Sequence, residues 1–171
     1  MALLFETPRL KIIEINGSLS NSEREYLLKQ IPLILSSSVV ESLPPYFHSI
    51  NSQEAAEVWL DRMLSKSRLF LVKLANGELV GFLFAYVENG RDAHIGYLLS
   101  EKYWGRGLAS ELLRGFIDEV TEEEAWVKLI AGVESSNMAS VSLLKKLGFV
   151  EQVASEEGVV FYEYSLREPS E

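Results

Sequence analysis

Residues 93–110 read AHIGYLLSEKYWGRGLAS, and this stretch decides the fold because strand, loop and helix signals follow one another in it. Residues 94–100 are apolar and rich in β-forming side chains, with Gly96 among them. A glycine inside a strand is typical of a bulge, or of a close approach by another backbone or a ligand. The pattern therefore predicts a strand that is distorted between Gly96 and Ser100.

The second half of the stretch, GRGLAS at residues 105–110, opens an amphipathic run. Small residues at a helix N-terminus leave several backbone N–H groups exposed, with the positive end of the helix dipole behind them. A turn of this kind binds anions, and it suits a diphosphate. We therefore expect a phosphate-bearing cofactor at this position.

Two common nucleotide-binding motifs are excluded. The sequence contains no Gly-Lys-Ser/Thr, so it has no P-loop. A dinucleotide-binding fingerprint needs glycine or alanine at the position of Ser110, in the first βα unit of a parallel sheet. Here the glycine turn follows strands that we expect to be antiparallel, so the turn belongs to a different class of phosphate site.

The composition indicates one domain over residues 1–171, because 47% of its residues are hydrophobic and 24% are charged. The sequence has neither an apolar run long enough to span a membrane nor a secretion signal, so we expect a cytoplasmic protein without a membrane partner. Its formal net charge of −9 argues against a nucleic-acid partner. Cysteine is absent, which excludes disulfides and a cysteine nucleophile, and no metal site is expected.

Hydrophobic periodicity predicts the order of helices and strands along the chain. We expect strands over 9–15, 69–74, 78–87, 94–100, 126–133, 149–154 and 159–166. Helices are expected over 23–35, 53–65, 108–120 and 137–147, and an irregular segment over 36–50. The dipeptide Asn76-Gly77 is expected to supply the positive φ values of a tight hairpin turn, and Asn89-Gly90 to join the next two strands. Ser52 is expected to cap the start of the helix over 53–65, and Gly148 the end of the helix over 137–147. This order predicts an α/β or α+β fold, a mixed sheet with helices on both faces.

Residues 102–107, KYWGRG, match the cofactor motif Gln/Arg-x-x-Gly-x-Gly/Ala of the GNAT N-acetyltransferase superfamily, with Lys102 in place of Gln/Arg. The surrounding IGYLLSEKYWGRGLASELL, the later NMASVSLLKKLGF and the early TPRLKI resemble the branch that contains N-terminal acetyltransferases of ribosomal proteins. The resemblance covers nearly the whole chain. It implies the GNAT fold, with a mostly antiparallel mixed central sheet.

The resemblance also implies acetyl-CoA as cosubstrate and assigns its contacts. The pantetheine arm is expected to bond the backbone of the strand end as an added strand would, at Leu98, Leu99 and Ser100. The diphosphate is expected on the N–H groups of the glycine turn and first helical residues: Gly105, Arg106, Gly107, Leu108, Ala109 and Ser110. Lys102 and Arg106 are expected to add positive charge.

Acetyl transfer to an amine needs a neutral amine, a donor to the oxyanion and a proton for the departing thiolate. A backbone N–H of Leu98 or Leu99 is the simplest oxyanion donor. His94 is the first candidate for the base, since histidine titrates near neutral pH, although the resembling branch often has Glu there. His48 and Glu134 stay open as alternatives.

Asn137 and Ser140 match the family's Asn-x-x-Ser spacing, one helical turn apart on one side of a helix. The resemblance implies that Asn137 contacts the pantetheine or an ordered water and that Ser140 donates to the sulfur. The alternative is helix capping by Ser135, Ser136 or Asn137. No tyrosine follows in this helix, so Ser140 is the candidate acid.

The sequence therefore predicts an acetyl-CoA-dependent N-acetyltransferase that transfers acetyl directly to a primary amine. The resemblance favours a protein N-terminal α-amine, such as that of a ribosomal protein, as the acceptor. A small amine, polyamine or aminoglycoside-like drug is the second choice, and a non-catalytic acyl-CoA sensor is the third. Loops 36–50 and 154–160 are expected to wall the acceptor pocket, and homodimers are common among the similar proteins.

Overall fold

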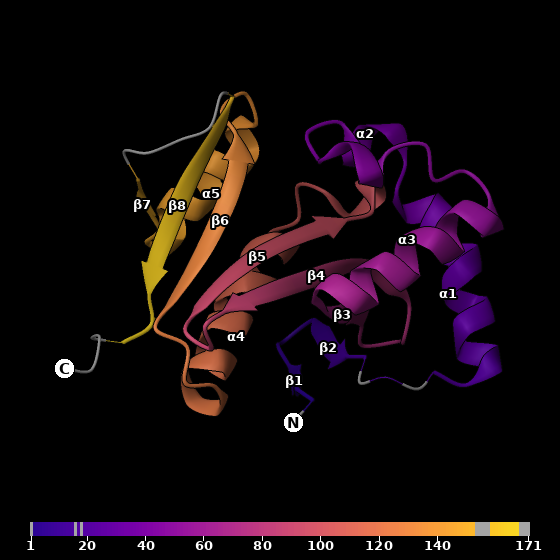
Figure 1. Ribbon diagram of the computed structural model, residues 1–171, viewed down its shortest axis with the longest axis horizontal. Helices are drawn as coiled ribbons and strands as arrows, with labels where there is room; N and C mark the ends of the chain where they lie inside the picture. Colours follow the sequence, from indigo (N-terminus) through magenta and orange to yellow (C-terminus); the bar gives the residue numbers. More distant parts are fainter. Residues whose placement is uncertain (1, 16, 18, 153–157, 168–171) are drawn as a thin grey trace. The chain divides into compact units, whose positions relative to one another are not determined.

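The computed structural model describes residues 2–15, 17, 19–152 and 158–167. Its described strands form a sheet in the order β1-β2-β3-β4-β5-β6-β8-β7 (Figure 1). The sheet contains parallel and antiparallel pairs, which confirms the predicted mixed sheet. The strands are β1 Leu4–Glu6, β2 Leu10–Glu14, β3 Arg68–Leu74, β4 Leu79–Glu88, β5 Asp92–Leu99, β6 Lys128–Glu134, β7 Val150–Glu151 and β8 Val159–Ser165. The helices are α1 Asn21–Ile34, α2 Ser37–Val40, α3 Gln53–Lys66, α4 Leu108–Glu123 and α5 Met138–Leu147, with the 3₁₀ turns η1 Pro45–Phe47 and η2 Glu101–Tyr103. Among the described helices, none is both long and apolar enough to cross a bilayer.

The chain forms two compact units. Unit 1 contains residues 1–84 and 97–108, and unit 2 contains residues 85–96 and 109–171. The chain passes between them within β4, within β5 and at the start of α4.

In unit 1 the helices α1 and α3 lie side by side (Figure 1). The helix α1 begins at Ser20 through a reciprocal capping box with Glu23, and α3 begins at Ser52, whose side chain accepts the Ala55 N–H. A cap of this kind satisfies N–H groups that have no partner inside the helix. The local sequence thus determines where each helix begins.

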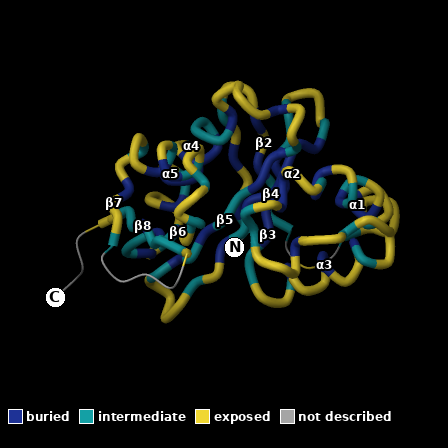
Figure 2. The backbone as a smooth tube through the Cα atoms, turned by 90° about the horizontal axis from the view of Figure 1, so that it is seen from above, coloured by how far each residue is buried: buried dark blue, intermediate teal, exposed yellow. Residues whose placement is uncertain are grey.

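The aromatic side chains of unit 1 join the helices to the sheet. Trp59 of α3 is buried and packs edge-on against Phe82 of β4, with 5.3 Å between ring centroids. Phe47 of η1 packs against both Trp59 and Phe84 at 5.9 and 5.5 Å. In Figure 2 the dark blue of β3 and β4 contrasts with the yellow outer turns of α1. Burial of these rings contributes to the hydrophobic stabilisation that holds the helices on the sheet.

The segment 36–50 is not wholly irregular, which corrects the prediction. It contains α2 and η1, and Val39, Val40 and Phe47 are buried in the hydrophobic core of unit 1. The sequence did not predict these short turns because serine and proline interrupt the apolar periodicity, and so few residues carry little pattern. Packing rather than propensity stabilises turns this short.

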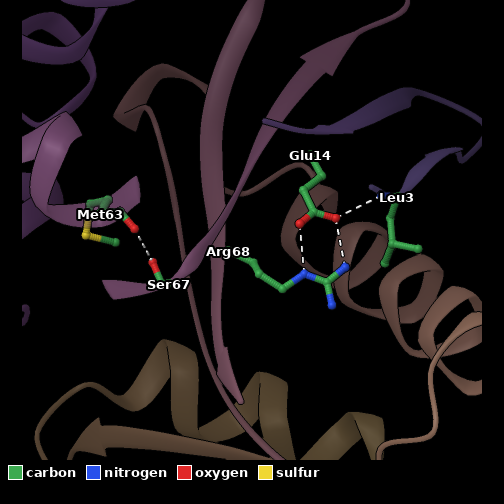
Figure 3. A network of polar contacts seen from close by, with 5 residues as sticks. All are labelled: Leu3, Glu14, Met63, Ser67 and Arg68. Carbon is green, nitrogen blue, oxygen red and sulfur yellow. Dashed lines mark hydrogen bonds and ion pairs between the residues drawn. The ribbon is translucent and has the colours of Figure 1, made fainter. Parts of the chain in front are cut away.

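The N-terminus adds a strand that the sequence analysis missed. Residues of β1 pair antiparallel with β2, from Leu4 opposite Ile13 to Glu6 opposite Lys11. Figure 3 shows why β1 stays attached: Glu14 accepts the Leu3 N–H at 2.8 Å and pairs with Arg68 through two 2.8 Å contacts. The short strand escapes periodicity analysis because three residues carry too little pattern.

The two predicted hairpin turns differ in detail. Asn89 and Gly90 both have positive φ, 54° and 68°, and the Arg91 N–H donates to the Glu88 carbonyl at 3.0 Å. That geometry is a type I′ turn, as expected. In the β3–β4 turn only Gly77 has positive φ, and the Asn76 side chain instead accepts the Glu78 N–H. The prediction that Asn76 also adopts positive φ is therefore wrong.

In unit 2, β8 pairs antiparallel with β6, and β6 pairs parallel with β5 through Asp92–Lys128, Ala93–Leu129 and His94–Ile130. Helix α5 ends at Gly148, whose φ of 106° is the left-handed cap predicted. The Tyr164 ring packs on Phe149 at 5.3 Å, which holds the end of α5 on β8. Residues 154–157 of the predicted loop 154–160 lie outside the described residues.

Candidate active site

The predicted phosphate turn lies in unit 1 between η2 and α4. Gly105 and Gly107 have φ of 75° and 76°, which side chains rarely adopt, and Arg106 between them does not share the positive φ. Alternating φ signs point successive N–H groups to one side and create an anion-binding concavity. Leu108 is buried and fixes the first turn of α4, whose next residues are Ala109 and Ser110. The backbone of residues 105–107 therefore suits an anion, and the predicted contacts of residues 105–110 with a diphosphate stay predictions.

Lys102 forms an ion pair next to this turn, and its predicted contact with the cofactor stays a prediction. Its Nζ lies 3.2 Å from Glu78 Oε1, and the Tyr103 hydroxyl donates to the same carboxylate. These contacts lower the pKa of Glu78, and the Glu78 carboxylate raises the pKa of Lys102. Burial raises the pKa of Tyr103. Lys102 thus ties η2 to the start of β4, while Arg106 places its guanidinium carbon 5.6 Å from the Tyr103 ring centre.

The end of β5 is held tightly against β4 within unit 1. The Ser100 N–H donates to the Val80 carbonyl at 2.8 Å, and the Ser100 carbonyl accepts from Tyr103 at 2.9 Å. The Leu99 carbonyl accepts from the Trp104 indole at 2.9 Å. The Ser100 backbone therefore has partners within the protein. The predicted contacts of Leu98, Leu99 and Ser100 with the pantetheine stay predictions.

A glycine makes this close approach possible. A Cβ atom on Gly81 would collide with the Leu98 carbonyl oxygen and meet Leu99 Cδ2 at 2.8 Å. The alternation of buried residues in β5 also breaks, because Ile95, Leu98 and Leu99 are buried while Gly96 and Tyr97 are half-buried. Both observations agree with the predicted distortion between Gly96 and Ser100.

His94 lies in unit 2 on the sheet face opposite the buried Ala93 and Ile95, and 38% of its side chain is exposed. Its Nε2 lies 3.6 Å from Glu88 Oε2, and the rings of His94 and Tyr86 are 6.1 Å apart. Nε2 is covered and has no hydrogen-bond partner among the described residues. The sequence analysis missed Glu88, although its position next to the Asn89-Gly90 turn places it close to the following strand.

Asn137 caps α5, which is one of the alternatives considered. Its Oδ1 accepts the Ser140 N–H at 3.3 Å, in the first turn of the helix. Both side chains are half-buried. The predicted contacts of Asn137 and Ser140 with the cosubstrate stay predictions.

The two alternative bases occupy different surroundings. His48 Nε2 lies 2.8 Å from the Leu43 carbonyl oxygen, so this imidazole closes the loop around η1. Glu134 ends β6 opposite Val159 and is half-buried. Because His48 is engaged by its own loop, His94 is the better base candidate. The described residues contain no cluster of His, Asp or Glu able to hold a metal ion.

The family assignment rests on the sequence match together with this fold. Residues 28–150 match the family model described as an acetyltransferase (GNAT) domain. The chain therefore belongs to the GNAT acetyltransferase family. GNAT acetyltransferases use acetyl-CoA as the acetyl donor.

The individual relatives match shorter parts of the chain than the family model does. An uncharacterized N-acetyltransferase, p20 of Bacillus licheniformis, is 41% identical over 69 residues, 40% of this chain and 38% of the relative. The chain thus spans about two fifths of the curated relatives it matches.

Solved structures share the fold at low sequence identity. A RimL ribosomal L7/L12 alpha-N-protein acetyltransferase in complex with coenzyme A is 16% identical, with a TM-score of 0.75 over 95% of this chain and 98% of that one. A spermidine N-acetyltransferase from Vibrio cholerae in complex with CoA and spermine is 17% identical, with a TM-score of 0.72 over 92% and 95%.

Proposed function

We propose that this chain is an acetyl-CoA-dependent N-acetyltransferase that acetylates a protein N-terminal α-amine by direct transfer. The observation that carries the proposal is the pair of positive-φ glycines, Gly105 and Gly107, immediately before α4 in a GNAT domain. Bound acetyl-CoA supplies an activated acetyl group. The chain's own residues bind it, orient the acceptor and move the protons.

His94 is the proposed base. It accepts the proton that the acceptor nitrogen loses as the N–C bond forms and the C–S bond breaks. The Glu88 carboxylate lies 3.6 Å from Nε2. Because Nε2 is covered, Nδ1 is the proposed acceptor of the proton, on a side chain that is 38% exposed.

The backbone N–H groups of Leu98 and Leu99 are the proposed donors to the acetyl oxygen as it gains negative charge. Ser140, in the first turn of α5, is the proposed donor to the departing sulfur. Asn137 positions Ser140 by capping the same turn. Each of these roles follows from the family motifs and is compatible with the local geometry of its own unit.

The choice of acceptor is supported by the sequence motifs shared with ribosomal-protein acetyltransferases and by the RimL structure among the similar folds. A polyamine is the second candidate, because a spermidine acetyltransferase has the same fold. A carboxylate beside His94 would suit a cationic acceptor of either kind.

The test is a measurement of thiol release from acetyl-CoA with matched acceptors. One peptide has a free N-terminus and no lysine. The second peptide differs from the first only in its blocked N-terminus and in one added lysine. Spermidine forms the third arm, and mass spectrometry locates the acetyl group. We expect thiol release and acetylation with the first peptide only.

Transfer to spermidine alone would replace the proposed acceptor with a polyamine. Tight coenzyme A binding without acceptor-dependent thiol release in any arm would make the chain a non-catalytic acyl-CoA sensor instead.

A further inference from the structure

Arg9 lies in a tight turn far from the glycine turn in sequence. Thr7 N–H donates to the Leu10 carbonyl at 2.9 Å, and the Leu10 N–H donates to Thr7 Oγ1 at 3.1 Å. Pro8 and Arg9 therefore form the connection between β1 and β2, with a backbone fixed from both sides. The exposed Arg9 side chain extends from this fixed point.

The Arg9 guanidinium contacts the phosphate turn directly. Its Nη1 donates to the Arg106 carbonyl at 2.9 Å across 97 residues of sequence. Its Nη2 lies 3.6 Å from the position where a Cβ atom of Gly107 would be. Both residues belong to unit 1, so the contact lies within one compact body.

The geometry of a peptide bond gives this contact a consequence. In a trans peptide the C=O and the following N–H point in opposite directions. A cation that holds the Arg106 carbonyl therefore directs the Gly107 N–H to the opposite side. The positive charge also polarises the peptide group, which makes its N–H a stronger donor.

We propose that Arg9 is a positioning residue for the diphosphate of acetyl-CoA, acting through the Arg106–Gly107 peptide. It holds that peptide in the orientation that presents the Gly107 N–H to the anion. Gly107 in this peptide and Gly105 before it give the backbone here wide conformational freedom, so a side chain is needed to fix the peptide. The proposal rests on the proposed use of residues 105–110 as the diphosphate site.

The experiment measures coenzyme A binding by calorimetry, which needs neither an acceptor nor turnover. We compare wild type, Arg9→Ala and Arg9→Lys. Arg24→Ala is the matched control, because Arg24 is an arginine of the same unit that pairs with Asp61 at 2.8 Å. Arg9→Ala should raise the Kd on the order of tenfold, Arg9→Lys should raise it less, and the control should not change it.

A second arm separates the diphosphate from other parts of the ligand. Dephospho-CoA keeps the diphosphate and lacks only the 3′-phosphate, so Arg9→Ala should weaken both ligands by the same factor. In steady-state turnover, Arg9→Ala should raise the KM for acetyl-CoA. With S-acetylpantetheine, which has no diphosphate, the kcat/KM of Arg9→Ala should equal that of wild type.

The outcomes decide the proposal in either direction. A Kd within twofold of wild type in Arg9→Ala, with the thermal unfolding midpoint retained, would overturn it. A loss that appears with coenzyme A but not with dephospho-CoA would assign Arg9 to the 3′-phosphate instead. If Arg9→Ala fails to fold, the Kd of Arg9→Lys for coenzyme A decides the proposal. Lysine keeps the positive charge but lacks the planar guanidinium group of arginine. Failure of the proposed acetyl transfer would leave these binding results unaffected.

Discussion

His94 and Glu88 show how much chemistry depends on which way a single side chain points. Alternation along β5 buries Ala93 and Ile95 and leaves His94 on the opposite face with a carboxylate 3.6 Å away. The second histidine, His48, is instead engaged by the Leu43 carbonyl of its own loop. Two residues of the same type thus have different expected roles.

Replacing His94 by alanine should lower kcat about a hundredfold, because loss of a general base typically costs 10²–10⁴-fold. The Kd for coenzyme A should stay near the wild-type value. The acid limb of the pH–rate profile, where the base becomes protonated, should flatten. Steady-state kinetics over pH 5–9 checks this, with His48→Ala as the control variant. A wild-type pH profile in His94→Ala would remove the residue from the mechanism.

The sequence was sufficient to predict the glycine turn, His94 and Asn137 as residues of interest, because each belongs to a local motif. It was not sufficient for Arg9 or Glu88. The Arg9 contact spans 97 residues, so no local pattern contains it. The pairing of Lys102 with Glu78 was missed for a similar reason, because Glu78 lies 24 residues away in the β3–β4 turn.

At the scale of elements, the ends of helices were predicted most accurately. Ser52 and Gly148 cap α3 and α5 as the sequence indicates, because capping depends on a few adjacent residues. The strand β1 and the turns α2 and η1 were missed. These elements exist because of what they pack against, which a single stretch of sequence does not contain.

The contact between η2 and the β3–β4 turn should make stability depend on pH. The Tyr103 hydroxyl and Lys102 lower the pKa of Glu78 below 4.5. A carboxyl with a lowered folded pKa stabilises the fold above its unfolded pKa, and this contribution is lost as the pH falls through the folded value. Glu78→Gln should therefore unfold at a lower temperature than wild type at pH 7, and the two should converge toward pH 3.

Thermal unfolding followed by circular dichroism at pH 7, 5, 4 and 3 provides the measurement. Glu57→Gln, at an exposed position of α3, is the matched control. A Glu78→Gln difference that stays constant from pH 7 to pH 3 would contradict the assigned pairing.

At the scale of the whole molecule, ligand binding should report on both the site and the fold. A ligand at about 100 times its Kd stabilises a native state by about 2.7 kcal/mol. For a chain of this size that corresponds to a rise in Tm of roughly 5–10 °C. Coenzyme A should produce this rise in wild type, and Gly107→Glu should abolish it because a carboxylate repels the diphosphate.

Gly90→Glu is the matched control, since Gly90 has a similar φ of 68° and an added Cβ would meet nothing within 4 Å. Both variants carry the same charge change and the same backbone strain. Differential scanning fluorimetry with and without coenzyme A compares them. An equal rise in Tm for both variants would exclude residues 105–110 as the diphosphate site.

The mixed sheet and the family were predictable at this scale because several motifs occur in the right order along the chain. The expectation of a single domain stays a prediction, since the structure forms two compact units that share strands and a helix. The acceptor depends on loops, part of which lies outside the described residues. Loop sequences carry little periodic information, so the acceptor is the part of the function least accessible from sequence.

The Arg9–Arg106 contact also has a consequence in time. During synthesis the β1–β2 turn is made before its partner carbonyl, which lies 97 residues later in the chain. At elongation rates of roughly 5–20 residues per second that delay is about 5–20 seconds. During this interval Arg9 and the strands beside it lack the segment that completes their own unit. The β1–β2 hairpin of the nascent chain must therefore stay soluble until the glycine turn has been synthesised.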